Sequence, residues 1–596
     1  MTHPDTSREP RSSWTLRLAA MGLAGLGTAV FAPACSLVLG GNGGFQQCQS
    51  DADCDQFDGD WVCDLATNTC VEDGNADGST EGDGDPGDGD PTGDGDPTGD
   101  GDGDPTGDGD PSGDGDGDPT GCAAHTECSD LGPSYMCNCH GECVDMRTEQ
   151  CQKYDWPGGG AQVDGVTFIG SIMPTSPPFD TLVEPMENSS RMAVGDFNGE
   201  AELNNGDLVG WVGCDSEAGT MAVTAAQHLV DNLCVPAIVG PIFSESVIAV
   251  AENVTIDKEV FLMSPTGSNK EITNLDDNDL VWRTIASDVY QAEALADRLE
   301  IIVGAAPGNV VMLHKNDAYG NDLAMDAFAL ATGVDFTDVF AYDLQLDPMN
   351  PIADLGSHIA NTVLTDNGMN PPEYIVLVGT SEVTAFILGY LQYMGMQQNP
   401  VYPKFIVTHG AVAAMVDTIK YVSGMASTQM LLYATLEGVS PVIFDQQNFN
   451  AFNIRYNFTY NEDNTITSSS LAYDATLVTL FAMTAIPQSD PITGPNIAAQ
   501  MGKLIDPMGT YVSFGPQANT DFIPTAVNQL AVGGTVDLQG VSGVLDFDLA
   551  TGDVRTNLLG WQVAPGSGGL DDPELDPTRT YILNAEPATD GTWMDL

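Results

Sequence analysis

From residue 162 to the end, short apolar runs alternate along the chain with segments whose apolar residues recur every three or four positions. The short runs are typical of buried strands, and the longer spacing predicts amphipathic helices. We expect strands at 166–172, 237–239, 260–263, 310–313, 374–378, 405–407 and 430–433. We expect helices at 218–232, 244–253, 286–300, 322–331, 381–394 and 472–485.

Strand followed by helix, repeated many times, predicts βαβ units and a mostly parallel sheet. The region 162–596 is too long for one hydrophobic core, because single cores stop growing at about 250–300 residues. The pattern therefore predicts an α/β protein built from two lobes.

Residues 1–34 have the pattern of an export signal. Three arginines precede an apolar run at 18–32, and small residues then lead to Cys35. A basic start, a short apolar run and a small-residue cleavage site make a secretory signal, and the run is shorter than the ~20 residues of a membrane-spanning helix. Small residues directly before a cysteine also resemble the lipobox of bacterial lipoproteins, although Ala32 stands where leucine is usual.

We therefore expect lipidation of Cys35, with residues 35–47 as an anchor or tether. The chain has 13 cysteines, and lipidation of one leaves an even number that can pair. The protein is then exported and lipid-anchored to the bacterial envelope, at the outer membrane or in the periplasm. Cleavage without lipidation, which gives a secreted protein, stays open.

Residues 71–121 repeat the unit Gly-Asp-Gly-Asp-Pro-Thr. The segment has no Lys, Arg or aromatic residue, so it buries no apolar surface, and we expect a disordered, extended linker. Calcium binding is the alternative use of alternating Asp oxygens, but the closing Glu and apolar frame of a calcium loop are missing from this sequence.

The whole chain is strongly acidic, with 17 Lys+Arg against 86 Asp+Glu and a net charge of −69. This balance excludes non-specific nucleic-acid binding, which needs a surplus of cations. It also disfavours docking on an anionic membrane surface, so contact with a membrane is expected only through the lipid anchor.

Two cysteine clusters flank the linker, at 48–70 and at 122–151. Their members are Cys48, Cys54, Cys63 and Cys70, and then Cys122, Cys128, Cys137, Cys139, Cys143 and Cys151. Both counts are even and export favours oxidation, so each cluster is predicted to close on itself as a small disulfide-stapled module. Zinc binding with the help of His125 and His140 is the alternative, and the lack of a Cys-x2-Cys pair disfavours it.

Cys214 and Cys234 stand at opposite ends of the expected helix 218–232. A helix of this length separates them by roughly 20 Å at 1.5 Å per residue, whereas a disulfide needs Cα atoms within ~7 Å. We therefore predict that these two cysteines do not bridge each other and remain as unpaired thiols.

Six segments carry a resemblance to a known family. They read VPAIVGPIFS at 235–244, VFLMSPTGSN at 260–269, VWRTIASD at 281–288, VVMLHKNDAYG at 310–320, LAYDA at 471–475 and GVSGVLDFD at 540–548. In this order they resemble the type I periplasmic binding proteins, in particular the leucine/isoleucine/valine-binding branch that serves branched-chain amino-acid ABC transporters.

The resemblance implies two Rossmann-like lobes joined by three crossovers, with a ligand between them and a hinge that closes the lobes around it. Lobe 1 is expected at about 162–284 and 438–550, and lobe 2 at about 286–436 and 555–590. The family implies an amino-acid-like small molecule, read by an ABC permease or a sensor, and no cofactor or metal.

Three residues of lobe 1 are candidate ligand contacts. Ligands of doubly wound sheets bind beyond the carboxyl ends of the strands. Ser244 follows one predicted strand and opens a helix, and Thr266 and Ser268 follow the next strand. Hydroxyls and free N–H groups suit an anion, and matching positions in the family hold the carboxylate and ammonium of an amino acid. Helix capping is the alternative role.

Lobe 2 contributes four further candidates. Tyr319 matches a family aromatic residue at the rim of the cleft, with packing inside its own lobe as the alternative. Thr380 and Ser381 follow a buried strand and open a helix, as a contact segment of the family does. His409 stands where amino-acid binders tend to carry an acid for the ligand ammonium; a histidine there meets a carboxylate or hydroxyl, or caps its loop.

These features predict an exported solute-binding protein that captures a small polar ligand, an amino acid or a related compound. An enzyme is not predicted, because the sequence has no Gly-x-Ser-x-Gly, His-Glu-x-x-His or phosphate-loop motif. The alternative function is a surface interaction or adhesion protein that uses the cysteine-rich modules, with the large domain as a scaffold.

Overall fold

The structure is a computed structural model. It describes residues 61–64, 69–72, 121–177, 179–342, 371–396, 398–442, 445–461, 464, 467–515, 522–583 and 591–596. The export signal, Cys35, Cys48, Cys54 and all but the ends of the acidic linker lie outside these residues. The chain divides into two units, and the boundary in the sequence falls between Ser112 and Gly113.

The described part of the first unit is a β-hairpin. Strand β1 (Trp61–Asp64) pairs antiparallel with β2 (Thr69–Glu72), and this register places Cys63 directly opposite Cys70. The hairpin thus places two of the four cysteines of the first cluster opposite each other.

Lobe 1, in the second unit, is built on a six-stranded sheet of order β10-β9-β8-β6-β7-β5. Its strands are β5 (Lys153–Asp155), β6 (Val166–Met173), β7 (Leu208–Asp215), β8 (Ala237–Val239), β9 (Phe261–Ser264) and β10 (Val281–Arg283). All neighbours pair in parallel except β5, which runs antiparallel to β7 at the edge. The parallel strands are mostly apolar because helices cover both faces of a parallel sheet.

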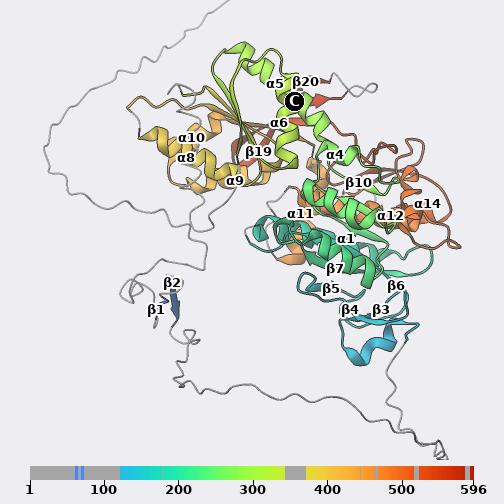
Figure 1. The fold of residues 1–596 in the computed structure, drawn as a ribbon. Coiled ribbons are helices and arrows are strands. Elements are labelled where there is room, and N and C mark those ends of the chain that lie inside the picture. The colour runs from blue at the N-terminus through green and yellow to red at the C-terminus, as the bar shows by residue number, and fades with distance from the viewer. Residues whose placement is uncertain are drawn as a thin grey trace, which may run out of the picture. The chain divides into compact units, whose positions relative to one another are not determined.

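The helices of lobe 1 are α1 (Asp180–Glu200), α2 (Ala222–Gln227), α3 (Ser244–Val250), α4 (Lys270–Thr273), α11 (Gln446–Tyr460), α12 (Ser469–Thr484), α13 (Gly494–Ala498) and α14 (Phe522–Ala531). Helix α12 is buried along its whole length and lies beside α1 (Figure 1). Its threonine hydroxyls donate to carbonyls one turn earlier in the helix, for example from Thr476 Oγ1 to the carbonyl of Ala472 at 2.8 Å. A short parallel pair, β16 (Thr510–Ser513) and β17 (Val536–Gln539), completes the lobe.

Lobe 2 has an eight-stranded sheet of order β12-β11-β13-β14-β15-β18-β19-β20. The parallel strands are β11 (Val310–Lys315), β12 (Phe336–Tyr342), β13 (Tyr374–Val378), β14 (Lys404–Val407) and β15 (Leu436–Pro441). The antiparallel strands are β18 (Leu558–Gly566), β19 (Gly569–Ile582) and β20 (Thr592–Asp595). The helices are α5 (Asp288–Ala305), α6 (Ala318–Leu330), α8 (Val383–Gly395), α9 (Val412–Tyr421) and α10 (Ala426–Thr435).

Three crossovers join the lobes, as the family resemblance implies. The chain leaves lobe 1 after β10, returns after β15, and crosses again before β18. The first and third crossovers are tied by a buried ion pair between Arg283 and Asp553, with 2.7 Å from Nε to Oδ1. The predicted α/β architecture of two Rossmann-like lobes is therefore confirmed.

One predicted strand is wrong. Residues 430–433 lie inside α10, where Leu432 is buried and Met430 is 55% exposed. The run of apolar residues there has the burial period of a helix, and the strand that follows is β15. The apolar character of residues 430–433 could not by itself distinguish a strand from a helix, since short apolar runs suit either element.

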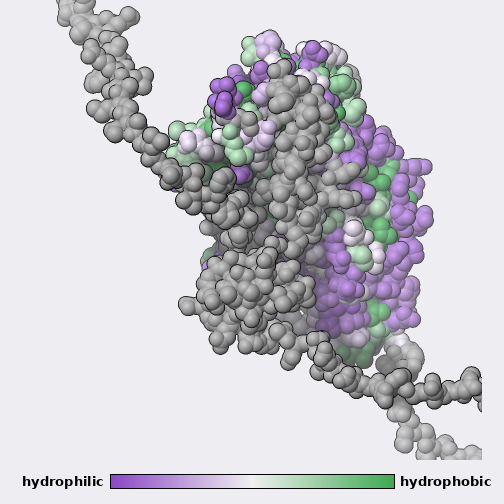
Figure 2. Space-filling view, turned by 60° about the vertical axis from the view of Figure 1, so that its left-hand side comes forward, coloured by the Kyte–Doolittle hydropathy of each residue, from purple (hydrophilic) through white to green (hydrophobic). Residues whose placement is uncertain are grey.

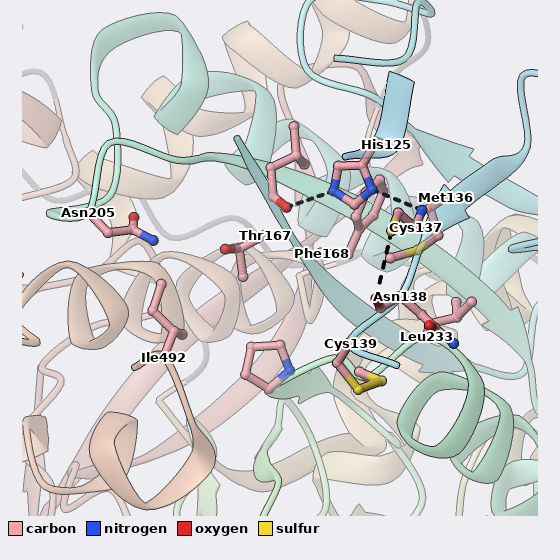
Figure 3. Close-up of a pocket in the computed structure, with 13 residues that line it drawn as sticks. His125, Met136, Cys137, Asn138, Cys139, Thr167, Phe168, Asn205, Leu233 and Ile492 are labelled. Carbon is pink, nitrogen blue, oxygen red and sulfur yellow. Dashed lines mark hydrogen bonds between the residues drawn. A yellow bond between two sulfur atoms is a disulfide. The ribbon is translucent and has the colours of Figure 1, made fainter. Parts of the chain in front are cut away.

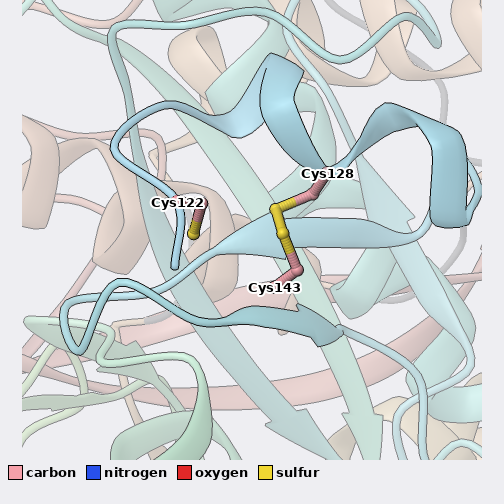
Figure 4. A group of neighbouring side chains, drawn as sticks. All are labelled: Cys122, Cys128 and Cys143. Atoms are coloured by element: carbon pink, nitrogen blue, oxygen red, sulfur yellow. A yellow bond between two sulfur atoms is a disulfide. The ribbon is translucent and has the colours of Figure 1, made fainter. Parts of the chain in front are cut away.

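The second cysteine cluster does not close on itself, so that prediction is wrong. Two disulfides, Cys122–Cys137 and Cys128–Cys143, do lie within it; Figure 4 shows the second of these with Cys122 beside it. The other two, Cys139–Cys234 and Cys151–Cys214, join it to lobe 1. The pairing of β5 with β7 is the reason for the last one, because Cys151 precedes β5 and Cys214 lies in β7.

Cys214 and Cys234 therefore do not bridge each other, as predicted, but neither is an unpaired thiol. The remaining contacts also make the cluster part of lobe 1. His228 Nε2 lies 3.0 Å from the carbonyl of Met146, and Asn138 Nδ2 donates to the carbonyl of Asn232 at 2.9 Å.

The surface agrees with the acidic composition. Hydrophilic residues cover much of the described surface on the right of Figure 2. Among the described residues, none of the helices has both the length and the apolar character needed to cross a bilayer.

Candidate functional site

Ser244, Thr266 and Ser268 lie together at the carboxyl ends of β8 and β9. Ser244 begins α3, and its Oγ accepts the backbone N–H of Asn269 at 3.2 Å. Thr266 Oγ1 donates to the carbonyl of Ile242 at 2.8 Å. The hydroxyls of Ser244 and Thr266 thus link the loop after β8 to the loop after β9 by hydrogen bonds, and neither caps a helix.

Ser268 is fully buried, and its backbone carbonyl accepts the N–H of Asp288 at 2.7 Å. Its hydroxyl lies beside the carboxyl group of Asp288 without forming a well-aligned hydrogen bond. Helix α4 is capped by Asn269, whose Oδ1 accepts the N–H of Glu271 at 2.6 Å. Ser268 is therefore a buried hydroxyl without a capping role, at the point where the two lobes meet.

Tyr319 and His409 form the facing wall in lobe 2. Tyr319 is the second residue of α6 and is 7% exposed. Its hydroxyl lies 2.7 Å from Thr408 Oγ1 and accepts the N–H of Gly410 at 3.3 Å. The ring of Tyr319 meets the imidazole of His409 edge to face, with centroids 4.9 Å apart.

Thr380 and Ser381 lie between β13 and α8, and both are half-buried. The backbone N–H of Thr380 donates to Glu382 Oε1 at 2.8 Å, and its hydroxyl bonds to Glu382 Oε2. Tyr342 donates to the same carboxylate at 2.8 Å. Glu382 therefore already takes the donors of Thr380.

Asp288 and Gln291, both on α5, belong to the site although the sequence analysis did not select them. Asp288 is 1% exposed, and burial raises its pKa to about 7 against the opposing effects of Ser268 and Arg283. Gln291 is fully buried and donates from Nε2 to Asp288 Oδ1 at 2.9 Å. The sequence signal that could have identified Asp288 is an acidic residue in the first turn of a helix that follows a buried strand.

Burial also governs His409, whose pKa it lowers to about 3, so the imidazole is neutral. Nδ1 of His409 lies 2.7 Å from Gln291 Nε2, and its backbone N–H donates to Gln291 Oε1 at 3.2 Å. The lobe 2 side of the site is thus a neutral hydrogen-bonded wall around one buried carboxyl group.

Direct bonds join the lobes next to this wall. Asn269 of lobe 1 donates from Nδ2 to the carbonyl of Ala318 at 2.5 Å and to Asp322 Oδ2 at 3.0 Å. Lys270 Nζ lies 2.9 Å from both carboxylate oxygens of Asp326. These bonds attach the loop that carries Ser268 to the helix that carries Tyr319.

A cavity of about 270 Å³ lies elsewhere, where the second cysteine cluster meets lobe 1 (Figure 3). The polar groups around it are already paired: His125 Nε2 lies 3.1 Å from the carbonyl of Val166, and Thr167 Oγ1 donates to Asp207 at 2.8 Å. None of the predicted ligand contacts lines this cavity. The cysteine sulfurs beside it, Cys137, Cys139 and Cys234, are all in disulfides, so none is free to bind zinc.

The chain matches the model of the receptor family ligand-binding region over residues 185–564, which is more than half of its length. The protein therefore belongs to this family of ligand-binding regions. A comparison with curated protein sequences gives no match.

Solved structures share the fold at low sequence identity. The leucine-binding protein LivK of Thermotoga maritima is 18% identical, with 70% of this chain and 98% of that chain covered and a TM-score of 0.50. An ABC transporter solute-binding protein of Rhodopseudomonas palustris, in complex with 3,4-dihydroxybenzoic acid, is 13% identical, with 70% and 98% covered and a TM-score of 0.52. An amino-acid ABC transporter substrate-binding protein of Pseudomonas fluorescens is 14% identical, with 70% and 95% covered and a TM-score of 0.50.

Proposed function

We propose that this protein is an exported solute-binding protein that captures a small polar ligand between its lobes by hinge closure. The observation that carries the proposal is the meeting of Ser268 and Asp288, one from each side of the first crossover, next to Tyr319 and His409. Burying a polar group without a hydrogen-bond partner costs free energy, and both Ser268 Oγ and Asp288 Oδ2 are buried in this way, which supports a binding role for them. Hinge motion between lobes gives such groups access to a ligand.

The proposed ligand contacts are Ser244, Thr266 and Ser268 in lobe 1 and Tyr319, Thr380, Ser381 and His409 in lobe 2, with Asp288 added. An amino acid or a related small acid is the proposed ligand class. The named ligands of similar structures, leucine and 3,4-dihydroxybenzoic acid, fall in this range. An ABC permease or a sensor is the proposed partner, and a lipid on Cys35 is the proposed anchor.

The test is native mass spectrometry of the full chain, freshly purified from its export compartment, followed by thermal-shift titration with amino acids and small aromatic acids. A co-purified small molecule released by denaturation supports the proposal. A ligand at 100 times its Kd stabilises the folded chain by about 2.7 kcal/mol, so a bound compound gives a clear rise in Tm.

The matched variants are Ser268→Ala at the site and Ser489→Ala on the exposed surface of lobe 1. We expect the ligand-dependent rise in Tm to shrink for Ser268→Ala alone. An equal rise in both variants, or no ligand from either approach, contradicts the proposal.

A further inference from the structure

Gln291 contacts His409 at the groups that decide which of its ring nitrogens carries the proton. The two residues lie 118 positions apart in the sequence, and the Gln291 side chain is fully buried between Asp288 and His409. Its Nε2 is 2.9 Å from Asp288 Oδ1 and 2.7 Å from His409 Nδ1, and its Oε1 is 3.2 Å from the backbone nitrogen of His409.

The backbone N–H of His409 decides the orientation of the amide. An N–H group only donates, so the atom of Gln291 that faces it is the carbonyl oxygen Oε1. The amide nitrogen Nε2 then faces both Asp288 and Nδ1. This holds whether Asp288 carries a proton or not.

The orientation of the amide in turn places the imidazole proton. Gln291 Nε2 has no lone pair to offer, and it lies nearer to Nδ1 than Oε1 does, at 2.7 Å against 3.0 Å. A proton on Nδ1 faces the protons of the amide, so Nδ1 is the acceptor and the single proton of the neutral ring is on Nε2.

The Nε2 side of the ring has no hydrogen-bond partner among the described residues, and His409 keeps part of its surface exposed. The edge-to-face contact with Tyr319 holds the ring in place. The ring is thus a fixed N–H donor on the lobe 2 wall. Asp288 accepts from Gln291 through Oδ1, and its Oδ2 is buried without a hydrogen-bond partner among the described residues.

We propose that Gln291 is a positioning residue that holds His409 as the Nε2–H tautomer, and that the ligand presents a hydrogen-bond acceptor to this N–H. The inference rests on the proposed function and narrows its ligand class. The end of the ligand that meets lobe 2 carries a carboxylate, carbonyl or hydroxyl oxygen, and not a cationic amine. An ammonium group there faces another donor and loses its water without compensation.

The first test reads the tautomer directly and needs no ligand. Nitrogen-15 spectra of the histidine-labelled full chain separate protonated from unprotonated ring nitrogens, and His409→Gln identifies the signals. We expect an unprotonated Nδ1 in the native chain. Gln291→Glu replaces the donor by a second acceptor, so the proton moves to Nδ1, whereas the remote, half-buried Gln500→Glu leaves the signals unchanged. A protonated Nδ1 in the native chain overturns the proposal.

The second test compares probes with one carbon skeleton: leucine, 4-methylpentanoate, which lacks the ammonium, and 3-methylbutylamine, which lacks the carboxylate. 3,4-Dihydroxybenzoate is the aromatic probe. By calorimetry, we expect an acid without an amine to bind at least ~10-fold more tightly than the amine, and His409→Asp to reverse that order.

Tighter binding of the amine than of the acid by the native chain overturns the inference while the proposed function stands. Failure to bind any of the four probes, with no co-purified compound, counts against the proposed function and removes the ligand class with it. The tautomer is then decided by the nitrogen-15 spectra alone.

Discussion

Arg283 and Asp553 form an ion pair whose side chains are 1% and 4% exposed. The guanidinium also donates from Nη1 to the carbonyls of Gly267 and Asn269, at 3.2 and 2.8 Å. One side chain thus fixes the loop around Ser268 and ties it to the third crossover. A buried charge of this kind is stable only while its partner and its hydrogen bonds are present.

Arg283→Met is expected to lower the free energy of unfolding by about 3–5 kcal/mol, because it leaves the carboxylate of Asp553 buried without its cation. Lys258→Met is the matched control, since the Lys258–Asp231 pair is exposed and worth at most about 1 kcal/mol. Urea unfolding followed by circular dichroism measures both. Equal losses in the two variants contradict the role given to Arg283.

Asp288 predicts a pH dependence of stability. Its pKa is raised from 3.8 to about 7 in the folded chain because burial disfavours the charged form. The folded state therefore holds a proton that the unfolded state has lost, and stability falls as pH rises from 3.8 to about 7.

We expect Asp288→Asn to flatten this fall, as measured by urea unfolding at a series of pH values between 4 and 8. The buried Asp474, whose pKa is also about 7, keeps part of the slope. Asp490→Asn, at an exposed position, should leave the slope as it is. An unchanged slope in Asp288→Asn speaks against a protonated Asp288.

At the scale of elements, α4 and α6 are the helices that connect the lobes beside the site (Figure 1). The hydrogen bond to Asp326 raises the pKa of Lys270, which keeps the lysine charged at neutral pH. The pair is about one-third exposed, which makes its contribution small and dependent on salt. We expect this pair to help hold α4 of lobe 1 against α6 of lobe 2.

Lys270→Gln is expected to widen the distribution of distances between the lobes and to weaken ligand binding about two- to five-fold. Spin labels on non-natural residues at positions 489 and 301, one in each lobe, report the distance by electron resonance. The exchanged pair, Lys270→Asp with Asp326→Lys, should restore the native distribution. If Lys270→Gln has the native distribution of distances, the ion pair between Lys270 and Asp326 does not hold the lobes together.

At the scale of the whole molecule, the second cysteine cluster is an extension of lobe 1. Two disulfides, the β5–β7 pairing and the ion pair between Arg191 and Asp155 attach it there. The linker that ends at residue 121 therefore leads into lobe 1. Lobe 2 is joined to this assembly by the crossovers and by the bonds from α4 to α6.

Removal of the Cys139–Cys234 disulfide by a double change to alanine should cost more stability than removal of Cys122–Cys137. The first closes a loop with a sequence separation of 95 and the second one of 15, and the chain-entropy model gives a difference of about 1–2 kcal/mol. Urea unfolding of the two double variants measures it. A larger loss for Cys122–Cys137 contradicts this account.

Local pattern was enough for most strands and for the class of fold. The runs 237–239 and 374–378 coincide with β8 and β13, because a strand covered on both faces is apolar throughout. The same reasoning failed at 430–433, where the apolar run belongs to α10. The edge strand of lobe 1 that the pattern missed, β5, is only three residues long and carries no apolar run.

The sequence by itself determined the two-lobed α/β architecture, since strand and helix periods are local properties, and the order of its motifs carried the resemblance that implied the three crossovers. It also placed hydroxyls at the carboxyl ends of strands in lobe 1. Only the tertiary structure decided that Cys151 meets Cys214, that Ser268 meets Asp288 and that Gln291 meets His409. Each of these pairs depends on how strands and lobes pack, and packing between distant segments leaves no periodic trace in the chain.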